Sequence, residues 1–220
     1  MGVDQGAVQL DLSVSRGRFI ALEGGEGVGK STQLKALAAA LRARGHDVIE
    51  TREPGGSEGA EAIRRLLLEG SADRWTPGAE ALLFAAARAD HVAKTIRPAL
   101  EAGKWVVTDR FLDSSLAYQG GAGGISIEQL RQLHRVGSGG LLPDRTLLLT
   151  LPAEEAARRA ETRDRGASDR IGGRDAGYHL RVAESFALLA TQEPDRFRLI
   201  DALGEAEAVT ARLLAAVEDL

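Results

Sequence analysis

The sequence predicts an α/β protein with a five-stranded parallel sheet and helices on both faces. Two observations predict this fold. Short apolar runs alternate along the 220-residue chain with segments whose apolar residues follow helical spacing, and buried strands separated by helices are typical of a parallel sheet covered on both sides. A glycine-rich stretch also joins the first apolar run to the first helical segment, which is the usual setting of a phosphate-binding loop.

The runs that predict strands are short and are each built around adjacent apolar residues, as expected for strands of a buried parallel sheet. Each is followed by a turn or by a segment with helical periodicity. They lie at residues 18–24, 46–51, 104–109, 144–151 and 197–202.

Helical spacing of apolar residues predicts the intervening helices. The first ends in the basic, glycine-containing stretch 42–45, which is typical of a helix C-terminus. Pro77 and Pro152 stand at helix starts, where a missing N–H costs nothing, whereas Pro98 should disturb the long helical segment that contains it. The predicted helices cover residues 30–45, 58–70 and 77–103, a segment after residue 152, and a C-terminal segment around Leu213.

Composition narrows the classes of function. The chain is 44% hydrophobic and 27% charged with a formal net charge of −4, so neither a nucleic-acid coat nor a membrane-surface protein is favoured. The absence of cysteine excludes disulfides and thiolate metal sites and favours a reducing cytoplasm. No apolar run approaches the roughly 18 residues that span a bilayer. We expect residues 1–17 to form a flexible extension before a single domain at 18–220.

The glycine-rich stretch matches the phosphate-binding pattern G-x-x-x-x-G-K-[ST]. Its glycines allow backbone N–H groups to turn toward phosphate oxygens, and the following helix adds the partial positive charge of its N-terminus. Lys30 can reach the β- and γ-phosphates of a nucleotide, and the Ser31 hydroxyl can coordinate Mg²⁺. The predicted ATP-binding residues are Gly24, Gly25, Glu26, Gly27, Val28, Gly29, Lys30, Ser31 and Thr32.

This motif predicts the P-loop NTPase fold but leaves the class of protein open. A glycine-rich strand-to-helix turn is the structural alternative, although every fixed position of the pattern is present in the right context. A GTPase, a motor and a small-molecule kinase would all contain such a loop, so other residues must identify the phosphate acceptor.

Asp109 ends the third predicted strand and Arg110 directly follows it. A carboxylate at the end of a parallel strand is well placed to hold Mg²⁺ together with Ser31, and the arginine can grip a phosphate through two parallel hydrogen bonds. An ordinary surface ion pair is the alternative, but ligands of α/β proteins bind at this edge of the sheet.

Further motifs, taken in order, resemble the thymidylate kinase family. They are "FIALEGGEGVGKST" at 19–32, "TREPGG" at 51–56, "LLFAAARADH" at 82–91, "TDRFLDSSLAYQG" at 108–120, "LPD" at 142–144 and "DR" at 169–170. The resemblance runs from about residue 18 to the C-terminus. It implies a nucleoside monophosphate kinase-like fold that transfers the γ-phosphate of ATP to dTMP, with Mg²⁺, in the synthesis of dTTP for DNA replication.

The resemblance also implies an acceptor pocket for dTMP. Phe84 would stack on thymine and Arg88, four residues later on the same helix face, would bond its exocyclic oxygen. A core phenylalanine with a solvated arginine is the alternative for that pair, and a turn before a helix is the alternative for "TREPGG". Catalytic or dTMP-binding roles fall on Glu26, Arg52, Phe84, Arg88, Asp109, Arg110, Ser114, Ser115, Tyr118 and Gln119.

Glu26 is a carboxylate in a loop that binds anions, and the resemblance gives it a role. It would accept a hydrogen bond from the 3′-hydroxyl of dTMP. A side chain that points to solvent is the alternative.

A basic, glycine-containing stretch at about 163–177 resembles the lid that closes over ATP in this family. Some members carry a catalytic arginine in the phosphate loop, at the position of Gly27, whereas others supply it from the lid. We therefore expect Arg163 or Arg170 to stabilise the transition state, with a solvated charged loop as the alternative.

Two positions depart from the family pattern. The glycine run 121–124 lacks an arginine that many bacterial members have, and Thr150 replaces an aspartate. Neither change touches the phosphate loop, Arg110, or the pair of Phe84 and Arg88.

Two rival functions remain. One is a kinase of the same fold with another acceptor, although a cytosine amine would oppose the donors of Arg88. The other is a P-loop switch or partner-binding ATPase, which would need no acceptor pocket. The resemblance further implies a homodimer.

Overall fold

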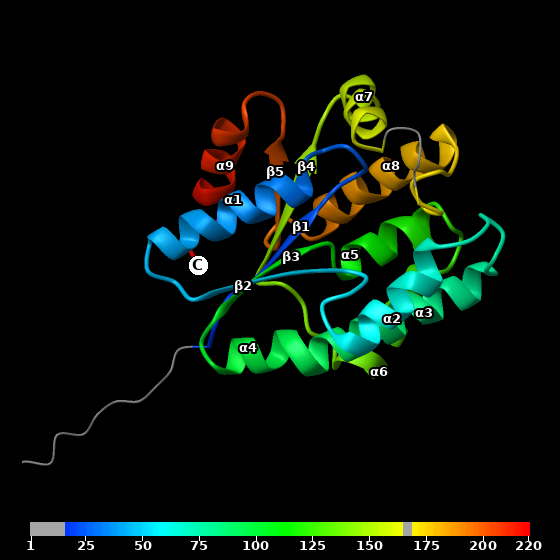
Figure 1. Cartoon of the computed structure of the whole chain (residues 1–220), viewed down its shortest axis with the longest axis horizontal. Coiled ribbons are helices and arrows are strands. Elements are labelled where there is room, and N and C mark those ends of the chain that lie inside the picture. The colour runs from blue at the N-terminus through cyan, green and yellow to red at the C-terminus, as the bar shows by residue number, and fades with distance from the viewer. Residues whose placement is uncertain (1–15, 165–168) are drawn as a thin grey trace, which may run out of the picture.

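The core of the protein is a five-stranded parallel sheet (Figure 1). The computed structural model describes residues 16–164 and 169–220. The strands are β1 (Phe19–Glu23), β2 (Val48–Arg52), β3 (Trp105–Asp109), β4 (Arg145–Thr150) and β5 (Phe197–Asp201). They lie in the order β2-β3-β1-β4-β5 and every neighbouring pair is parallel. The sheet predicted from the sequence is therefore confirmed, strand for strand.

Helices cover both faces of this sheet, as Figure 1 shows. They are α1 (Lys30–Ala43), α2 (Glu58–Leu68), α3 (Pro77–His91), α4 (Arg97–Glu101), α5 (Leu112–Ser115), α6 (Ile127–Ser138), α7 (Ala153–Asp164), α8 (Ala176–Gln192) and α9 (Ala206–Ala215). Two π-helical turns, Val92–Ile96 and Leu116–Gly121, continue α3 and α5.

Strand β1 divides the core in two because successive side chains of a strand point to opposite faces. Ile20 and Leu22 pack with α1 and α9, whereas Phe19 and Ala21 pack on the other side with α3, α6 and α8. All four side chains are fully buried. Burial on both faces explains why the strand is a continuous apolar run rather than an alternating one.

Pro98 disturbs the long helical segment as predicted. The segment divides into α3, the π-helical turn and α4, and Pro98 is the second residue of α4. Proline has no N–H to donate to the preceding turn, and local widening of the helix accommodates this loss.

The sequence analysis did not assign helices to α5, α6 and α8. For α6 the signals are present: Ser126 caps its start by accepting from the N–H of Gln129, and Gly139 ends it with a positive φ. The start of α8 lies inside the stretch expected to be the lid, where Asp175 accepts from the N–H of Tyr178. The end of the stretch predicted to be a lid is therefore the start of a helix.

The carboxyl edge of the sheet carries the chemistry. Leu22 of β1 pairs with Asp109 of β3, and the N–H of Arg110 donates to the carbonyl of Leu22 over 2.9 Å. Arg110 is also the one non-glycine residue of the described chain with a positive φ, 70°. The phosphate loop and Arg110 thus leave neighbouring strands side by side.

None of the helices in the described residues is long and apolar enough to cross a membrane.

The expected extension at 1–17 lies mostly outside the described residues. Gly17 already packs against the folded domain. Its N–H donates to the carbonyl of Leu100 over 2.9 Å, and a Cβ added to it would clash with the backbone of Lys104.

Candidate active site

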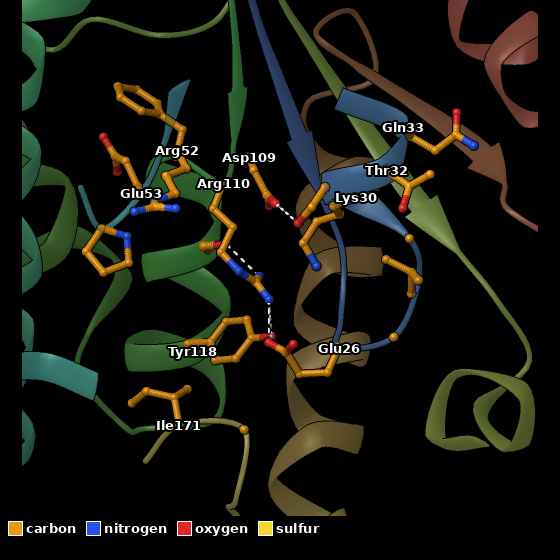
Figure 2. Close-up of a pocket in the computed structure, with 18 of the residues that line it drawn as sticks. Glu26, Lys30, Thr32, Gln33, Arg52, Glu53, Asp109, Arg110, Tyr118 and Ile171 are labelled. Carbon is orange, nitrogen blue, oxygen red and sulfur yellow. Dashed lines mark hydrogen bonds and ion pairs between the residues drawn. The ribbon is translucent and has the colours of Figure 1, made fainter. Parts of the chain in front are cut away.

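A cavity of about 750 Å³ opens at the carboxyl edge of the sheet. Side chains from the phosphate loop form one side, and side chains from α3, β3 and the turn after α5 form the other (Figure 2). The predicted site residues that line it are Glu26, Gly27, Val28, Gly29, Lys30, Ser31, Thr32, Arg52, Phe84, Arg88, Asp109, Arg110, Ser114, Ser115, Tyr118 and Gln119. The structure thus brings together nearly all the residues that the sequence analysis selected from distant segments.

The phosphate loop depends on glycine at its tip. Gly27 has a φ of 75°, and a Cβ added there would lie 2.1 Å from the carbonyl oxygen of Ala156 in α7. Real Cβ atoms do not approach backbone so closely, and L-residues rarely adopt this φ. The loop therefore reaches α7 only because position 27 has no side chain.

Lys30 and Ser31 begin α1 and face the loop. The ammonium of Lys30 donates to the carbonyls of Gly24 and Gly25 over 3.1 Å and 2.6 Å. Burial lowers its pKa to about 8, and the charge of Arg110 adds to this effect. A phosphate beside the ammonium would favour its charged form again.

The Ser31 hydroxyl donates to a carboxylate oxygen of Asp109 over 2.7 Å. Two oxygen ligands of the kind that Mg²⁺ prefers therefore lie together, next to the loop (Figure 2).

Arg110 occupies the middle of the cavity wall and joins its two sides (Figure 2). One terminal nitrogen donates to the carbonyl of Gly24 and to the Ser114 hydroxyl, over 3.0 Å and 3.1 Å. The other donates to Glu26 over 2.6 Å and to the Tyr118 hydroxyl over 3.1 Å. The guanidinium also lies 4.9 Å from the centre of the Tyr118 ring, a cation–π distance. Glu26 therefore faces a cation instead of standing alone among the phosphate-binding groups.

Glu23, the last residue of β1, supports this arrangement from beneath. Its carboxylate is fully buried and accepts hydrogen bonds from the N–H of Phe111, at 2.8 Å, and from the Ser114 hydroxyl, at 2.6 Å. Burial raises its pKa to about 7, and the nearby charge of Asp113 adds to the shift. Glu23 thus holds the backbone turn on which Arg110 is mounted.

Arg88 is held by a buried ion pair. Its Nε donates to Glu53 over 2.7 Å, and one terminal nitrogen donates to the Ser115 hydroxyl over 2.8 Å. The other oxygen of Glu53 lies 3.1 Å from His91. Arg88 is 3% exposed, which rules out the solvated arginine considered from the sequence.

Gln119 belongs to a second buried network. Its amide donates to Glu80 over 2.9 Å, and Glu80 also accepts from Arg170 and Arg174, each over 2.6 Å. Glu80 is 3% exposed.

Of the two arginines expected to act from the lid, Arg170 and Arg163, the structure describes the side chain of Arg170 alone. The guanidinium of Arg170 is completely buried and also donates to the carbonyl of Leu67 over 2.7 Å. Its side chain is not among those lining the cavity, although Asp169 and Ile171 are. The structure therefore does not bring Arg170 to the phosphate loop. The Arg163 side chain lies outside the described residues.

Three residues that line the cavity, Glu53, Arg64 and Arg159, are not predicted from the sequence. Arg52 is predicted, and it forms a solvent-exposed ion pair over 3.2 Å with Glu61, which does not line the cavity. Arg64 and Arg159 line the cavity, yet in the sequence each stands beside another arginine and looks like part of a charged helix face. Glu53 stands inside the quoted "TREPGG" motif but was given no role.

Comparisons with known proteins agree on one family. A family model described as thymidylate kinase matches residues 22–213. A thymidylate kinase of Rhizorhabdus wittichii is 69% identical over 204 residues, which are 93% of this chain and 98% of that protein. One of Caulobacter vibrioides is 50% identical over 200 residues, covering 91% and 95%. The crystal structure of a thymidylate kinase from Ehrlichia chaffeensis superposes with a TM-score of 0.74 and 29% identity, covering 92% of this chain and 100% of that one.

Glu23 should make the stability of the protein depend on pH. The pKa of its carboxyl is raised by burial from 4.5 to about 7, so between these values the folded protein binds a proton that the unfolded chain has released. Stability then falls as pH rises through this window. As pH rises from 4.5 to 7, the free energy of unfolding of the unaltered protein should decrease by on the order of 2 kcal/mol more than that of Glu23→Gln, which has no carboxyl group at this position. Urea unfolding at stepped pH measures this, and a pH-independent difference between the two proteins would contradict it.

Proposed function

This chain belongs to the thymidylate kinase family, and from that premise we propose how its residues carry the reaction. The chain transfers the γ-phosphate of ATP to dTMP, which gives dTDP and ADP, a step in dTTP synthesis. We propose that the phosphate loop binds ATP, that the wall formed by Phe84, Arg88, Tyr118 and Gln119 binds the base and sugar of dTMP, and that Arg110 stands between the two nucleotides.

The observation that supports this most strongly is the place of Arg110. It shares a cavity with the phosphate loop and with the proposed base wall, and its two terminal nitrogens contact Gly24 of the loop and Tyr118 of the wall. A switch or partner-binding ATPase would need no such second wall. A guanidinium held at the junction can bind the acceptor phosphate and stabilise charge that develops during transfer.

The other charged groups divide the remaining work. Lys30 holds the β- and γ-phosphates, and the loop N–H groups orient them. Arg52 binds the acceptor phosphate from the far side. Ser114 and Ser115 bear hydroxyls that already hold Arg110 and Arg88 in place. Arg163 is the proposed transition-state arginine of the lid, because Arg170 is committed to Glu80 in the structure.

Ser31 and Asp109 are the proposed holders of Mg²⁺. Their oxygens are 2.7 Å apart, and such hard oxygen ligands suit this ion, which commonly takes few ligands from a protein and the rest from water and phosphates. When bound with ATP, the ion neutralises charge on the transferring phosphate.

Arg88 and Gln119 should select the acceptor base. With ATP and Mg²⁺, we expect release of ADP with dTMP to exceed that with CMP by at least about a hundredfold, since cytosine leaves unpaired the polar groups of a site built to bond thymine. A coupled assay of ADP release over a panel of nucleoside monophosphates measures this. If dTMP released no more ADP than CMP or buffer, the assigned acceptor would be wrong.

The variant Glu26→Gln should weaken the binding of dTMP far more than the binding of ATP. A hydroxyl that donates to a carboxylate contributes roughly 1.5–3 kcal/mol, so KM for dTMP should rise about tenfold to a hundredfold while KM for ATP changes little. Steady-state kinetics give both constants.

The control for this variant is an acceptor that lacks the 3′-hydroxyl. With 3′-deoxy-dTMP, the unaltered protein and Glu26→Gln should have similar KM values. An equal loss with both acceptors would show that Glu26 acts by holding Arg110 rather than by binding the hydroxyl.

We also propose that the chain forms a homodimer in the cytoplasm. Exposed apolar side chains on helices that pack together support the dimer: Leu66 of α2, Leu82 of α3 and Val136 of α6, which is 89% exposed. Light scattering should give twice the chain mass of 23.3 kDa, and a single chain mass would contradict the proposal.

A further inference from the structure

Glu80 connects the proposed base wall with Arg170 and Arg174, in the second half of the stretch 163–177. It lies in the first turn of α3, and its two carboxylate oxygens are divided between these two parts. One oxygen accepts from Gln119 over 2.9 Å, and the other accepts from Arg170 and Arg174. We propose that Glu80 is a positioning residue that fixes the amide of Gln119 and thereby selects a pyrimidine whose N3 carries hydrogen. This rests on the proposed function, in which Gln119 contacts the base.

The carboxylate of Glu80 determines which end of the Gln119 amide faces it. A carboxylate accepts hydrogen bonds and donates none, whereas an amide has one oxygen that accepts and one nitrogen that donates. Facing Glu80, the Gln119 amide can therefore present only its nitrogen. The amide oxygen, on the other branch of the same planar group, is left for the cavity that Gln119 lines.

An amide oxygen in the cavity distinguishes bases by N3. Thymine carries hydrogen on N3 and can donate to it, whereas N3 of cytosine is an acceptor and would oppose it. A buried acceptor that faces another acceptor loses its hydrogen bond and costs free energy. Glu80 thus contributes to base selection without touching the base.

Arg170 and Arg174 make a buried carboxylate tolerable at this place. An unpaired charge in the interior is very unfavourable, and both guanidinium groups lie within 2.6 Å of Glu80. Arg170 is further tied to the carbonyls of Leu67 and Ala72. The carboxylate is therefore held on one side by rigid partners, and its other side holds Gln119.

The neighbouring wall residue is supported from the same segment. The Tyr178 hydroxyl donates to the carbonyl of Tyr118 over 2.8 Å, and the Arg174 guanidinium lies 4.5 Å from the centre of the Tyr178 ring. Two adjacent residues of the proposed acceptor pocket, Tyr118 and Gln119, are thus braced by the chain between Arg170 and Tyr178. This gives the stretch from Arg170 to Tyr178 a function in acceptor binding.

The test compares dTMP with 5-methyl-dCMP, which keeps the thymine methyl group but has an acceptor at N3. In Glu80→Gln, the new amide can donate as well as accept, so Gln119 can turn over. The ratio of kcat/KM for dTMP to that for 5-methyl-dCMP should fall about tenfold, while KM for ATP stays within about twofold. In the Gln119→Ala background, Glu80→Gln should change the ratio no further, because the effect passes through Gln119.

Two more variants separate positioning from mere stability. Arg174→Gln removes one partner of Glu80 and should lower the ratio in the same direction by about threefold. Because the Arg174 side chain is 21% exposed, this variant carries the test if Glu80→Gln does not fold. The matched control is Arg145→Gln, which breaks the ion pair between the buried Arg145 and the exposed Asp219, at the end of β4 away from the cavity. It should lower the urea midpoint and leave the ratio unchanged.

Three outcomes would overturn the inference: an unchanged ratio in Glu80→Gln and Arg174→Gln, an equal loss with both acceptors, or additive effects of Glu80→Gln and Gln119→Ala. If Gln119→Ala alone leaves the ratio unchanged, the proposed role of Gln119 is wrong and the inference falls with it. If Gln119→Ala lowers the ratio but Glu80→Gln does not, the inference alone fails.

Discussion

The ion pair between Arg110 and Glu26 joins the two halves of the site, and its geometry follows from the sheet. Strands β1 and β3 are parallel neighbours, so the phosphate loop and Arg110 leave the same edge next to each other. The positive φ of Arg110 turns its side chain back across that edge, where the nitrogens reach Gly24 and Glu26. A different strand order would separate the donor loop from the acceptor wall, although each motif would still be present in the chain.

Two of the cavity arginines, Arg88 and Arg110, are held in place through buried carboxylates. Glu53 orients Arg88, and Glu23 orients Arg110 through Ser114. Buried carboxylates cost folding free energy unless they are paired, and they hold their partners in a single geometry when they are. Cations that are already oriented need little rearrangement when charge develops on a phosphate. The site therefore sacrifices some stability for preorganisation.

The strands, the phosphate loop and most of the cavity residues could be predicted from the sequence, because local periodicity and contiguous motifs determine them. The partners of those residues could not. Nothing near residue 80 indicates that Glu80 meets Arg170, since ninety residues separate them and tertiary packing alone unites them. The basic, glycine-containing stretch around Arg170 therefore predicts a lid arginine, whereas the guanidinium of Arg170 is buried against Glu80. The α6 helix differs: its cap residues Ser126 and Gly139 are visible in the sequence and could have been used.

Close contact between Gly27 and α7 excludes any side chain at this position of the phosphate loop. The space beside this tip is filled by the backbone of Ala156, so a side chain at position 27 and a closely docked α7 cannot coexist. An arginine at position 27 would therefore need α7 to move away from the loop. In this chain the backbone of α7 fills that space, so the phosphate loop and α7 pack directly against each other at the one loop position where a side chain would separate them.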